Sequence, residues 1–369
     1  MPYFECNNIR IAGIACAVPE TIVKVDSFEN QVGKEAIEKF KKATGIERFH
    51  KTLDNQTASD LGYAAAKKLL EQLNISPETI QALLFVSHSP DYRRPATAAV
   101  LQMRLGLPKD CACYDINLGC SAYPYGVVTL SSMMECSNIS RALLICAESP
   151  TKIANPLDRT TAMLFGDAGS ASLLLKEKSH CCGIKGAMRT DGYNYRAIIV
   201  PAGGFRNLYA PKDITCWHDG NQRHLHNLYM NGGDVFNFTI TEVPRLIQEF
   251  LQHYEVTVEE FDSFIMHQAN LFIMKQISRK ARFPLEKMPV SLDRYGNTSA
   301  AAIPLTLCDA YAKQNTNTQS NIKVLMCGYG VGLSWGVISA TLTTNELVPV
   351  FTSNETFTEG LIESPTDLE

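Results

Sequence analysis

The sequence predicts an α/β fold with a mostly parallel sheet that helices cover on both faces. Short, continuous apolar runs recur at residues 82–86, 142–146, 171–175, 264–266 and 323–327. Runs of this length are typical of strands buried on both faces. Other segments space their apolar residues at helical intervals, most clearly residues 58–73, which end near Asn74. Strands that alternate with helices indicate a covered, parallel sheet.

The composition is that of an ordinary globular protein. With 369 residues, 45% of them hydrophobic and 20% charged, the chain is too long for one small module and is neither disordered nor collagen-like. The 34 basic and 38 acidic residues give a net charge of −4, so we expect no nucleic-acid partner. The twelve cysteines are scattered, without a Cys-x-x-Cys pair. Together with an N-terminus that lacks a signal-peptide pattern, they favour reduced thiols in the cytoplasm.

Two long stretches contain no charged residue, at positions 116–134 and 324–345. Each is long enough for a transmembrane helix. Both are interrupted by residues that break helices, such as Gly119, Pro124 and Gly126 in the first and Gly328 and Gly330 in the second. We therefore expect no membrane association, and predict instead that both stretches are buried where the backbone approaches other groups closely.

Cys120 is the candidate nucleophile. Residues 114–118 begin as a strand, Gly119 allows a tight turn, and a run compatible with a helix follows. A cysteine at the N-terminus of a helix lies near free N–H groups and the positive end of the helix dipole, which stabilise the thiolate. The sequence thus predicts a lowered thiol pKa and an accessible sulfur. The other eleven cysteines are expected to be structural.

His267 and Asn297 are the candidate partners of Cys120. His267 directly follows an apolar run, at the carboxyl end of a predicted strand, where parallel sheets carry their chemistry. Asn297 follows Gly296 in a turn that leads into a helix of small residues. Either residue alone is more often structural. Their presence together with a candidate nucleophile favours a catalytic set.

At this point the chain resembles the β-ketoacyl-acyl carrier protein synthase III family of thiolase-fold condensing enzymes. The resemblance runs from about residue 9 to about residue 343, in the family's order and spacing. Its motifs are Asn117-Leu118-Gly119-Cys120-Ser121, Asp158-Arg159-Thr160-Thr161, Phe165-Gly166-Asp167-Ala168-Gly169, Met230-Asn231-Gly232-Gly233, His267-Gln268-Ala269-Asn270-Leu271, Gly296-Asn297-Thr298-Ser299 and Gly330-Val331-Gly332-Leu333-Ser334. No single motif decides the matter, but their succession is specific.

The resemblance implies a five-layered α-β-α-β-α thiolase-like fold built from two similar halves, and a homodimer. The N-terminal half with the nucleophile would span residues 1–178, and the C-terminal half with the histidine and asparagine residues 179–345. A plausible seam lies at residues 177–182, where polar residues interrupt the pattern. Residues 346–369 contain acidic residues and no lysine or arginine, and are expected to form a weakly ordered acidic tail.

The resemblance also implies a ping-pong decarboxylative Claisen condensation. Cys120 would accept an acyl group from an acyl thioester, and the carbanion from a malonyl thioester on acyl carrier protein would attack it. His267 Nε2 and the Asn297 amide would donate hydrogen bonds to the enolate oxygen, and the backbone N–H groups of Cys120 and Val331 would hold the tetrahedral oxyanion. Acyl-CoA and the phosphopantetheine of the carrier protein are substrates, and no resident cofactor or metal is expected. A metal at His224 and His226 is not favoured because no third ligand stands nearby.

Further contacts are implied with less specificity. Substrate-binding positions would be Arg159, which in the family contacts the CoA adenine, Phe165 on the acyl tunnel, Arg94, Asn270 and Gly233. The basic residues Lys275, Arg279 and Lys280 follow the histidine on a predicted helix, and could dock the acidic carrier protein by charge complementarity. A solvated helix face would explain them equally well.

Several positions depart from the family. No tryptophan stands near Lys39, where one often stacks on adenine, and Asn237 and Phe272 replace basic residues. In the family, the loop containing Arg94 closes the acyl pocket of the dimer partner, usually with a bulky apolar residue. An arginine there suggests a polar acyl group, a different carrier or a loop that points elsewhere.

Three rival functions remain open. A same-fold acyltransferase would pass the acyl group from Cys120 to a hydroxyl or amine without condensation, but it needs no enolate stabilisation. A papain-like cysteine hydrolase is chemically possible, yet the chain lacks its local signatures. A catalytically silent partner subunit is credible mainly when the cysteine is missing.

Overall fold

The computed structural model describes residues 2–177, 183–312 and 320–368. Its larger sheet has six strands, and its smaller principal sheet has five. In sheet order, the six are β17 (Phe351–Ser353), β2 (Ile9–Pro19), β8 (Ala168–Lys176), β7 (Arg141–Glu148), β5 (Ala82–Val86) and β6 (Ala112–Ile116). The five are β1 (Tyr3–Cys6), β9 (Ile184–Thr190), β16 (Ser334–Thr343), β15 (Asn321–Gly330) and β14 (Ser263–Met266).

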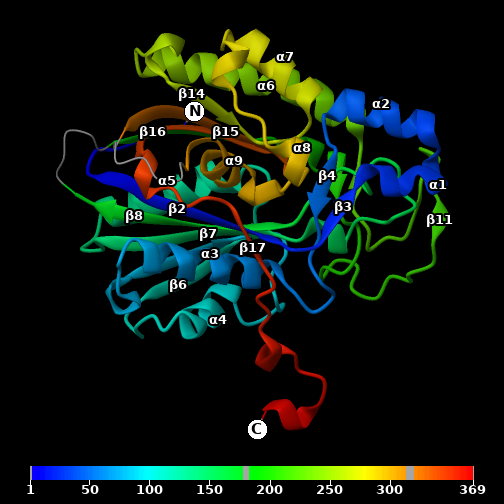
Figure 1. Ribbon diagram of the computed structural model, residues 1–369, viewed down its shortest axis with the longest axis horizontal. Coiled ribbons are helices and arrows are strands. Elements are labelled where there is room, and N and C mark those ends of the chain that lie inside the picture. Colours follow the sequence, from blue (N-terminus) through cyan, green and yellow to red (C-terminus); the bar gives the residue numbers. More distant parts are fainter. Residues whose placement is uncertain (1, 178–182, 313–319, 369) are drawn as a thin grey trace.

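Helices form three layers around these sheets (Figure 1), and each layer has its own apolar cluster. The helices α3 (Ala58–Gln72) and α4 (Thr97–Arg104) cover the outer face of the six-stranded sheet. Between the sheets lie α5 (Ala122–Glu135) and α9 (Ala302–Tyr311), and the outer face of the five-stranded sheet is covered by α6 (Gly232–His253) and α7 (Leu271–Ala281). This order of layers confirms the predicted five-layered α-β-α-β-α fold.

The strand β15 shows why the apolar runs are continuous. Val324 and Met326 belong to the central cluster with α5 and α9, whereas Leu325 and Cys327 belong to the outer cluster with α6 and α7. Alternate side chains therefore point to opposite faces, and helices cover both. The same burial explains the strands predicted at residues 82–86, 142–146, 171–175 and 264–266, all of which form.

The prediction of a mostly parallel sheet is wrong. The pairs β17–β2, β7–β5, β5–β6 and β14–β15 are parallel. The pairs β2–β8, β7–β8, β1–β9, β9–β16 and β15–β16 are antiparallel. Burial on both faces produces a continuous apolar run whatever the direction of the neighbouring strand. The continuous apolar runs therefore indicated that helices cover both faces of the sheet, but they did not indicate the direction of the strands.

The uncharged stretches form ordinary parts of this fold. Residues 116–134 run from the end of β6 through a turn into α5, and residues 324–345 lie mainly in the β15–β16 hairpin. Within the described ranges, none of the helices has the length and apolar character needed to cross a bilayer. The helix expected at residues 58–73 spans Ala58–Gln72 and begins with a capping box between Thr57 and Asp60.

The two halves exchange edge strands. The N-terminal β1 joins the five-stranded sheet, and β17 from the C-terminal stretch joins the six-stranded sheet. The predicted seam between residues 178 and 179 lies outside the described residues. Shorter elements complete the fold: β3 (Ile22–Lys24), α1 (Glu29–Val32), α2 (Lys34–Thr44), β4 (Arg48–His50), β10 (Ile198–Ile199), β11 (Thr215–Cys216), β12 (Gln222–Arg223), β13 (Tyr229–Met230) and α8 (Leu292–Tyr295).

The prediction of a weakly ordered tail is wrong for its first part. Leu347 and Val348 are buried, and β17 pairs with β2. Arg104 lies over the ring of Phe357, with 4.6 Å between the guanidinium carbon and the ring centroid. Apolar residues inside the acidic stretch attach it to the sheet. The charge of the stretch, on which the prediction was based, does not take these residues into account. Beyond these contacts the C-terminal end extends away from the body of the molecule (Figure 1).

Candidate active site

Cys120 lies in the turn between β6 and α5, directly before Ser121, the N-cap residue of the helix. The last residues of β15 pass close to it. A Cβ atom at Gly330 would lie 2.5 Å from Cys120 Cβ and 2.7 Å from its Sγ, and one at Gly328 would lie 2.9 Å from the Cys120 carbonyl oxygen. These two glycines therefore allow the backbone at the end of β15 to contact the nucleophile directly.

The predicted lowering of the Cys120 pKa is wrong, because burial is the largest influence and raises the pKa of the thiol. Hydrogen bonding with the backbone of Val331, the Ser299 hydroxyl and the backbone of Cys120 itself acts in the opposite direction. Cys120 Sγ lies 3.9 Å from Ser299 Oγ. The thiol is therefore largely protonated at pH 7, but it is surrounded by donors that stabilise negative charge on the sulfur.

His267 directly follows β14, and its backbone is held on both sides. Its N–H donates to the Cys327 carbonyl oxygen at 2.8 Å, and its own carbonyl oxygen accepts from the Tyr329 hydroxyl at 3.2 Å. The Tyr329 ring packs edge-on against the imidazole, with 5.4 Å between ring centroids. Burial lowers the pKa of His267 to about 4, while hydrogen bonding to the Ser299 backbone acts in the opposite direction. The imidazole is therefore neutral at pH 7, with one N–H donor.

Asn297 is positioned by its backbone and by one atom of its side chain. Its N–H donates to the Leu164 carbonyl oxygen at 2.9 Å, and its carbonyl oxygen accepts from the Gly166 N–H at 3.1 Å. Asn297 Oδ1 accepts from the Ser299 N–H at 3.0 Å. Because this contact requires an acceptor, it identifies the oxygen of the amide and leaves the Nδ2 donors without a partner among the described residues.

These three residues line one cavity of about 520 Å³, together with Val331 and Ser299. Much of its wall is apolar and includes Ile153, Leu164, Phe165, Leu228, Met230 and Val235. The chain thus brings together a sulfur nucleophile, a neutral histidine and a carboxamide with free N–H groups from positions far apart in the sequence. Such a set can receive a group on sulfur and stabilise negative charge that develops on an oxygen.

The other predicted substrate positions fall into two groups. Phe165 and Asn270 line the cavity, although Asn270 Oδ1 also caps α7 by accepting from the Ile273 N–H. Gly233 is not among the lining residues, whereas its neighbour Gly232 is. Arg94 and Arg159 have exposed side chains and do not line the cavity.

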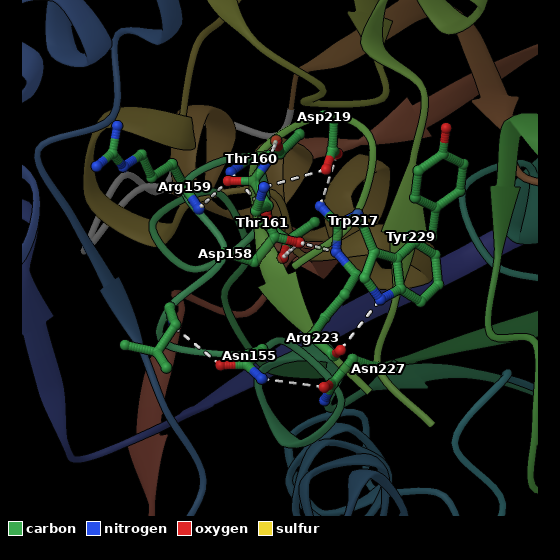
Figure 2. A network of polar contacts seen from close by, with 12 residues as sticks. Asn155, Asp158, Arg159, Thr160, Thr161, Trp217, Asp219, Arg223, Asn227 and Tyr229 are labelled. Carbon is green, nitrogen blue, oxygen red and sulfur yellow. Dashed lines mark hydrogen bonds and ion pairs between the residues drawn. The ribbon is translucent and has the colours of Figure 1, made fainter. Parts of the chain in front are cut away.

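The backbone around Arg159 is held by a buried network (Figure 2). Arg223 Nε lies 3.0 Å from Asp158 Oδ2, and both side chains are completely buried. Asn221 accepts from the Arg159 N–H at 3.0 Å, and its amide donates to the Thr160 hydroxyl at 3.1 Å. The segment around Arg223 therefore fixes the turn from which the Arg159 side chain extends outward.

Aromatic rings complete this bracing network. The guanidinium carbon of Arg223 lies 5.0 Å from the ring centroid of Trp217 and 5.3 Å from that of Tyr229. Arg223 Nη2 also contacts Asp219 Oδ2 at 2.9 Å. The network connects the chain near Ile153 with the chain near Leu228, and both of these residues line the cavity. The network thus holds these two parts of the apolar cavity wall in position.

Lys275, Arg279 and Lys280 lie on α7, the helix predicted to follow His267, and their side chains are exposed. Arg279 donates to Gln276 Oε1 at 3.0 Å, and Lys280 Nζ donates to the Ile240 carbonyl oxygen at 2.8 Å. His224 and His226 lie near each other, but the described residues contain no group of three potential metal ligands.

His88, Glu148 and Ser299 also line the cavity beside Cys120, although the sequence did not indicate them. His88 follows β5 and Glu148 ends β7, at the same edge of the sheet at which Cys120 follows β6. The available signal was a polar residue at the end of an apolar run. That signal is weak, because polar residues commonly bound strands of every kind.

Comparison with known proteins gives a consistent result. Residues 114–192 match the family model of 3-oxoacyl-[acyl-carrier-protein (ACP)] synthase III, and residues 251–342 match the model of its C-terminal part. The chain is 32% identical over 330 residues to the beta-ketoacyl-[acyl-carrier-protein] synthase III of Clostridium perfringens, covering 89% of this chain and 98% of that protein. The enzyme of the same name from Caldanaerobacter subterraneus is also 32% identical, over 333 residues, covering 89% of this chain and 97% of its own.

Solved structures agree with the sequence comparison. A 3-oxoacyl-(acyl-carrier protein) synthase from Burkholderia xenovorans superposes with a TM-score of 0.88 at 33% identity, covering 95% of this chain and 99% of that one. The beta-ketoacyl-[acyl carrier protein] synthase III of Thermus thermophilus superposes with a TM-score of 0.76 at 28% identity, covering 91% of this chain and 99% of its own.

Proposed function

Because the chain belongs to the 3-oxoacyl-[acyl-carrier-protein] synthase III family, we propose that it is a condensing enzyme that joins an acyl group to a malonyl thioester on acyl carrier protein. The observation that carries the proposal is the hydrogen bonding of the Asn297 side chain together with the protonation state of His267. Asn297 Oδ1 is occupied by the Ser299 N–H, so the amide presents donors, and burial keeps His267 neutral. Both residues line the cavity of Cys120.

In the first half-reaction the Cys120 sulfur attacks the carbonyl carbon of an acyl thioester. The bond to the donor's sulfur breaks, and the released thiol takes the proton that Cys120 gives up. Negative charge develops on the carbonyl oxygen in between. The backbone N–H groups of Cys120 and Val331 are the proposed donors to this oxygen, and the close approach of Gly330 to Cys120 supports this role.

In the second half-reaction the malonyl group loses carbon dioxide, and the electron pair of the broken carbon–carbon bond forms an enolate. His267 Nε2–H and Asn297 Nδ2–H would donate hydrogen bonds to the enolate oxygen. The enolate carbon then attacks the acyl carbon, and the Cys120 thiolate leaves. A preorganised donor of this kind lowers the barrier by about 3–4 kcal/mol. A transferase that passes the acyl group to a hydroxyl or amine would not need these donors.

The test separates loading from condensation. The protein is incubated with an acyl-CoA, the acylated peptide is identified by mass, and malonyl-acyl carrier protein is then added. We expect acylation at Cys120 followed by release of a β-ketoacyl product, with both lost in Cys120→Ala. Acylation of Cys120 without any ketoacyl product, but with transfer to a hydroxyl or amine, would show the same-fold acyltransferase instead.

The proposal also covers the oligomeric state of the enzyme, its protein partner, its cellular location and its substrates. We expect a homodimer, and β6 supports this because it is the last strand in its sheet, with half-buried side chains. We expect α7 to dock acyl carrier protein through Lys275, Arg279 and Lys280. We place the enzyme in the cytoplasm, which suits the free cysteines among the described residues. Acyl-CoA and the carrier's phosphopantetheine serve as substrates, and the reaction needs no resident cofactor.

A further inference from the structure

A second polar group lies beside Cys120 and has no role in the reaction described above. His88, Asn117 and Glu148 all line the cavity. They follow or end β5, β6 and β7, three adjacent parallel strands in which Val86 pairs with Ile116 and with Cys146. The carboxyl ends of these strands thus place the three side chains at one end of the cavity, next to the nucleophile.

Glu148 is the fixed member of this group. One carboxyl oxygen accepts from the His88 backbone N–H and the other from the Ser89 hydroxyl, both at 2.7 Å. Burial raises the pKa of Glu148 to about 8. The carboxyl group is therefore held in place by its neighbours and is mostly protonated at pH 7. It acts as an anchor for the loop that begins at His88.

The His88 ring is packed against the turn of the nucleophile and still faces the cavity. A Cβ atom at Gly119 would lie 2.8 Å from His88 Nδ1, so only glycine fits between them without displacement. The side chain nevertheless keeps a large accessible surface, and it is one of the residues that line the cavity. Burial lowers the pKa of His88 to about 4, while hydrogen bonding of the ring with the Asn117 backbone acts in the opposite direction. The ring is therefore neutral at pH 7, and the nitrogen that does not bond to the Asn117 backbone is left for a ligand in the cavity.

Asn117 has unused hydrogen-bonding capacity. Its side chain is exposed, lines the cavity and forms no hydrogen bond with any described residue. An alkyl chain bound here would displace water from the Asn117 amide and the His88 ring without forming hydrogen bonds to replace those with water. No lysine or arginine lies among the described residues that line the cavity, so a carboxylate would find no cation there.

We infer that the acyl group carried by Cys120 bears an uncharged hydroxyl group near its carbonyl, which hydrogen-bonds to His88 and Asn117. This inference rests on the proposed loading of Cys120 and specifies its substrate class. The arginine at position 94 suggested a polar acyl group, and this inference agrees with that suggestion. The residues that would recognise the acyl group are different, because the exposed Arg94 side chain does not line the cavity of its own chain.

The test compares butyryl-CoA with its hydroxybutyryl-CoA isomers as donors, by the initial rate at which Cys120 gains mass. We expect at least one hydroxybutyryl isomer to load about tenfold faster than butyryl, the factor that one hydrogen bond supplies. His88→Leu and Asn117→Leu should each bring this ratio close to one while butyryl still loads. His88→Gln, which retains hydrogen-bonding groups, should keep the preference.

The controls separate this inference from the proposed function. His253→Leu changes an exposed histidine on α6 and should leave the ratio unchanged, and thermal unfolding of each variant checks folding. Equal or faster loading of butyryl by the unaltered protein overturns the hydroxyacyl inference and leaves the loading reaction intact. A preference that survives in both His88→Leu and Asn117→Leu also overturns it. No loading of Cys120 by any donor overturns the proposed function.

Discussion

The reaction centre and the bracing network both bury polar side chains, but they use them differently. Asn297 and His267 are positioned mainly through their backbones and line a cavity, and the Asn297 Nδ2 donors have no partner among the described residues. In the bracing network most polar atoms are paired with one another, as in the ion pairs of Arg223 with Asp158 and Asp219, although Arg223 Nη1 has no partner among the described residues. Open hydrogen-bonding capacity next to a cavity therefore marks the reaction centre, whereas burial and charge alone do not.

The comparison also separates activity from stability. A donor that has no protein partner contributes little to folding, so removing it should affect the reaction and spare the fold. A charge whose partner is buried contributes to folding only as long as the pair is intact. Changes in the two regions should accordingly appear in different measurements.

The largest effect is expected for Cys120→Ala. Without the sulfur no acyl group can be attached, so acylation and ketoacyl formation should both be abolished. The free energy of unfolding should change by less than about 1 kcal/mol, because the side chain faces a cavity. Mass spectrometry and urea denaturation measure the two quantities. Cys136→Ala, at an exposed cysteine, is the matched control and should keep full acylation.

The opposite pattern is expected for Arg223→Met. It leaves the carboxylate of Asp158 buried without its cation, which costs about 3–5 kcal/mol of the free energy of unfolding. Loading of Cys120 should persist at low temperature, since Arg223 does not line the cavity. Arg245→Met, which breaks an exposed pair with Glu242 on α6, should cost less than about 0.5 kcal/mol. Equal losses in the two variants would contradict the role of burial.

Asn297→Asp tests the reaction centre without changing its shape. The acid keeps an oxygen for the Ser299 N–H but replaces the free N–H donors with an acceptor. We expect ketoacyl formation to fall by about 10²–10³-fold, or about 3–4 kcal/mol, while acylation of Cys120 continues. A parallel loss of both reactions would indicate that Asn297 acts in loading as well, and would remove the separation between the two half-reactions.

Much of this arrangement could be predicted from the sequence, and the exceptions have physical causes. The strand at residues 82–86 forms as predicted because its burial on both faces leaves an unambiguous run. Cys120, His267 and Asn297 could be found because each lies at a junction marked by glycine or by the end of an apolar run. Strand direction could not be predicted, since β7 and β8 are equally apolar whether they are parallel or antiparallel.

Long-range pairs were also beyond reach. Arg223 and Asp158 are separated by 65 residues, and nothing local in either segment indicates that they form a buried ion pair. His88 is a single polar residue after a strand, and only the folded structure shows that its ring packs against Gly119 and lines the cavity. The C-terminal stretch looked acidic and weakly ordered, although Leu347 and Val348 are buried and attach its first part to the fold.

The pH dependence of stability should reveal the neutral histidine. Burial lowers the pKa of His267 from 6.5 to about 4, so between these values the unfolded chain binds a proton that the folded protein does not. Stability is therefore unaffected by this group above pH 6.5 and falls as the pH decreases toward 4. Between pH 7 and pH 5, His267 alone should lower the free energy of unfolding by about 2 kcal/mol. His267→Asn should reduce this difference, as measured by urea denaturation at both pH values.

The smallest effects are expected at the surface of α7, where charged side chains neither line the cavity nor lie buried. Lys275→Glu with Arg279→Glu should raise the KM for malonyl-acyl carrier protein several-fold and weaken its salt dependence, because exposed charges act mainly on encounter. Loading from acyl-CoA and the free energy of unfolding should stay within about 0.5 kcal/mol. Lys109→Glu, at an exposed residue between α4 and β6, is the control, because α4 and α7 lie on opposite sides of the molecule (Figure 1). If both variants raise the KM equally, net charge and not α7 governs docking.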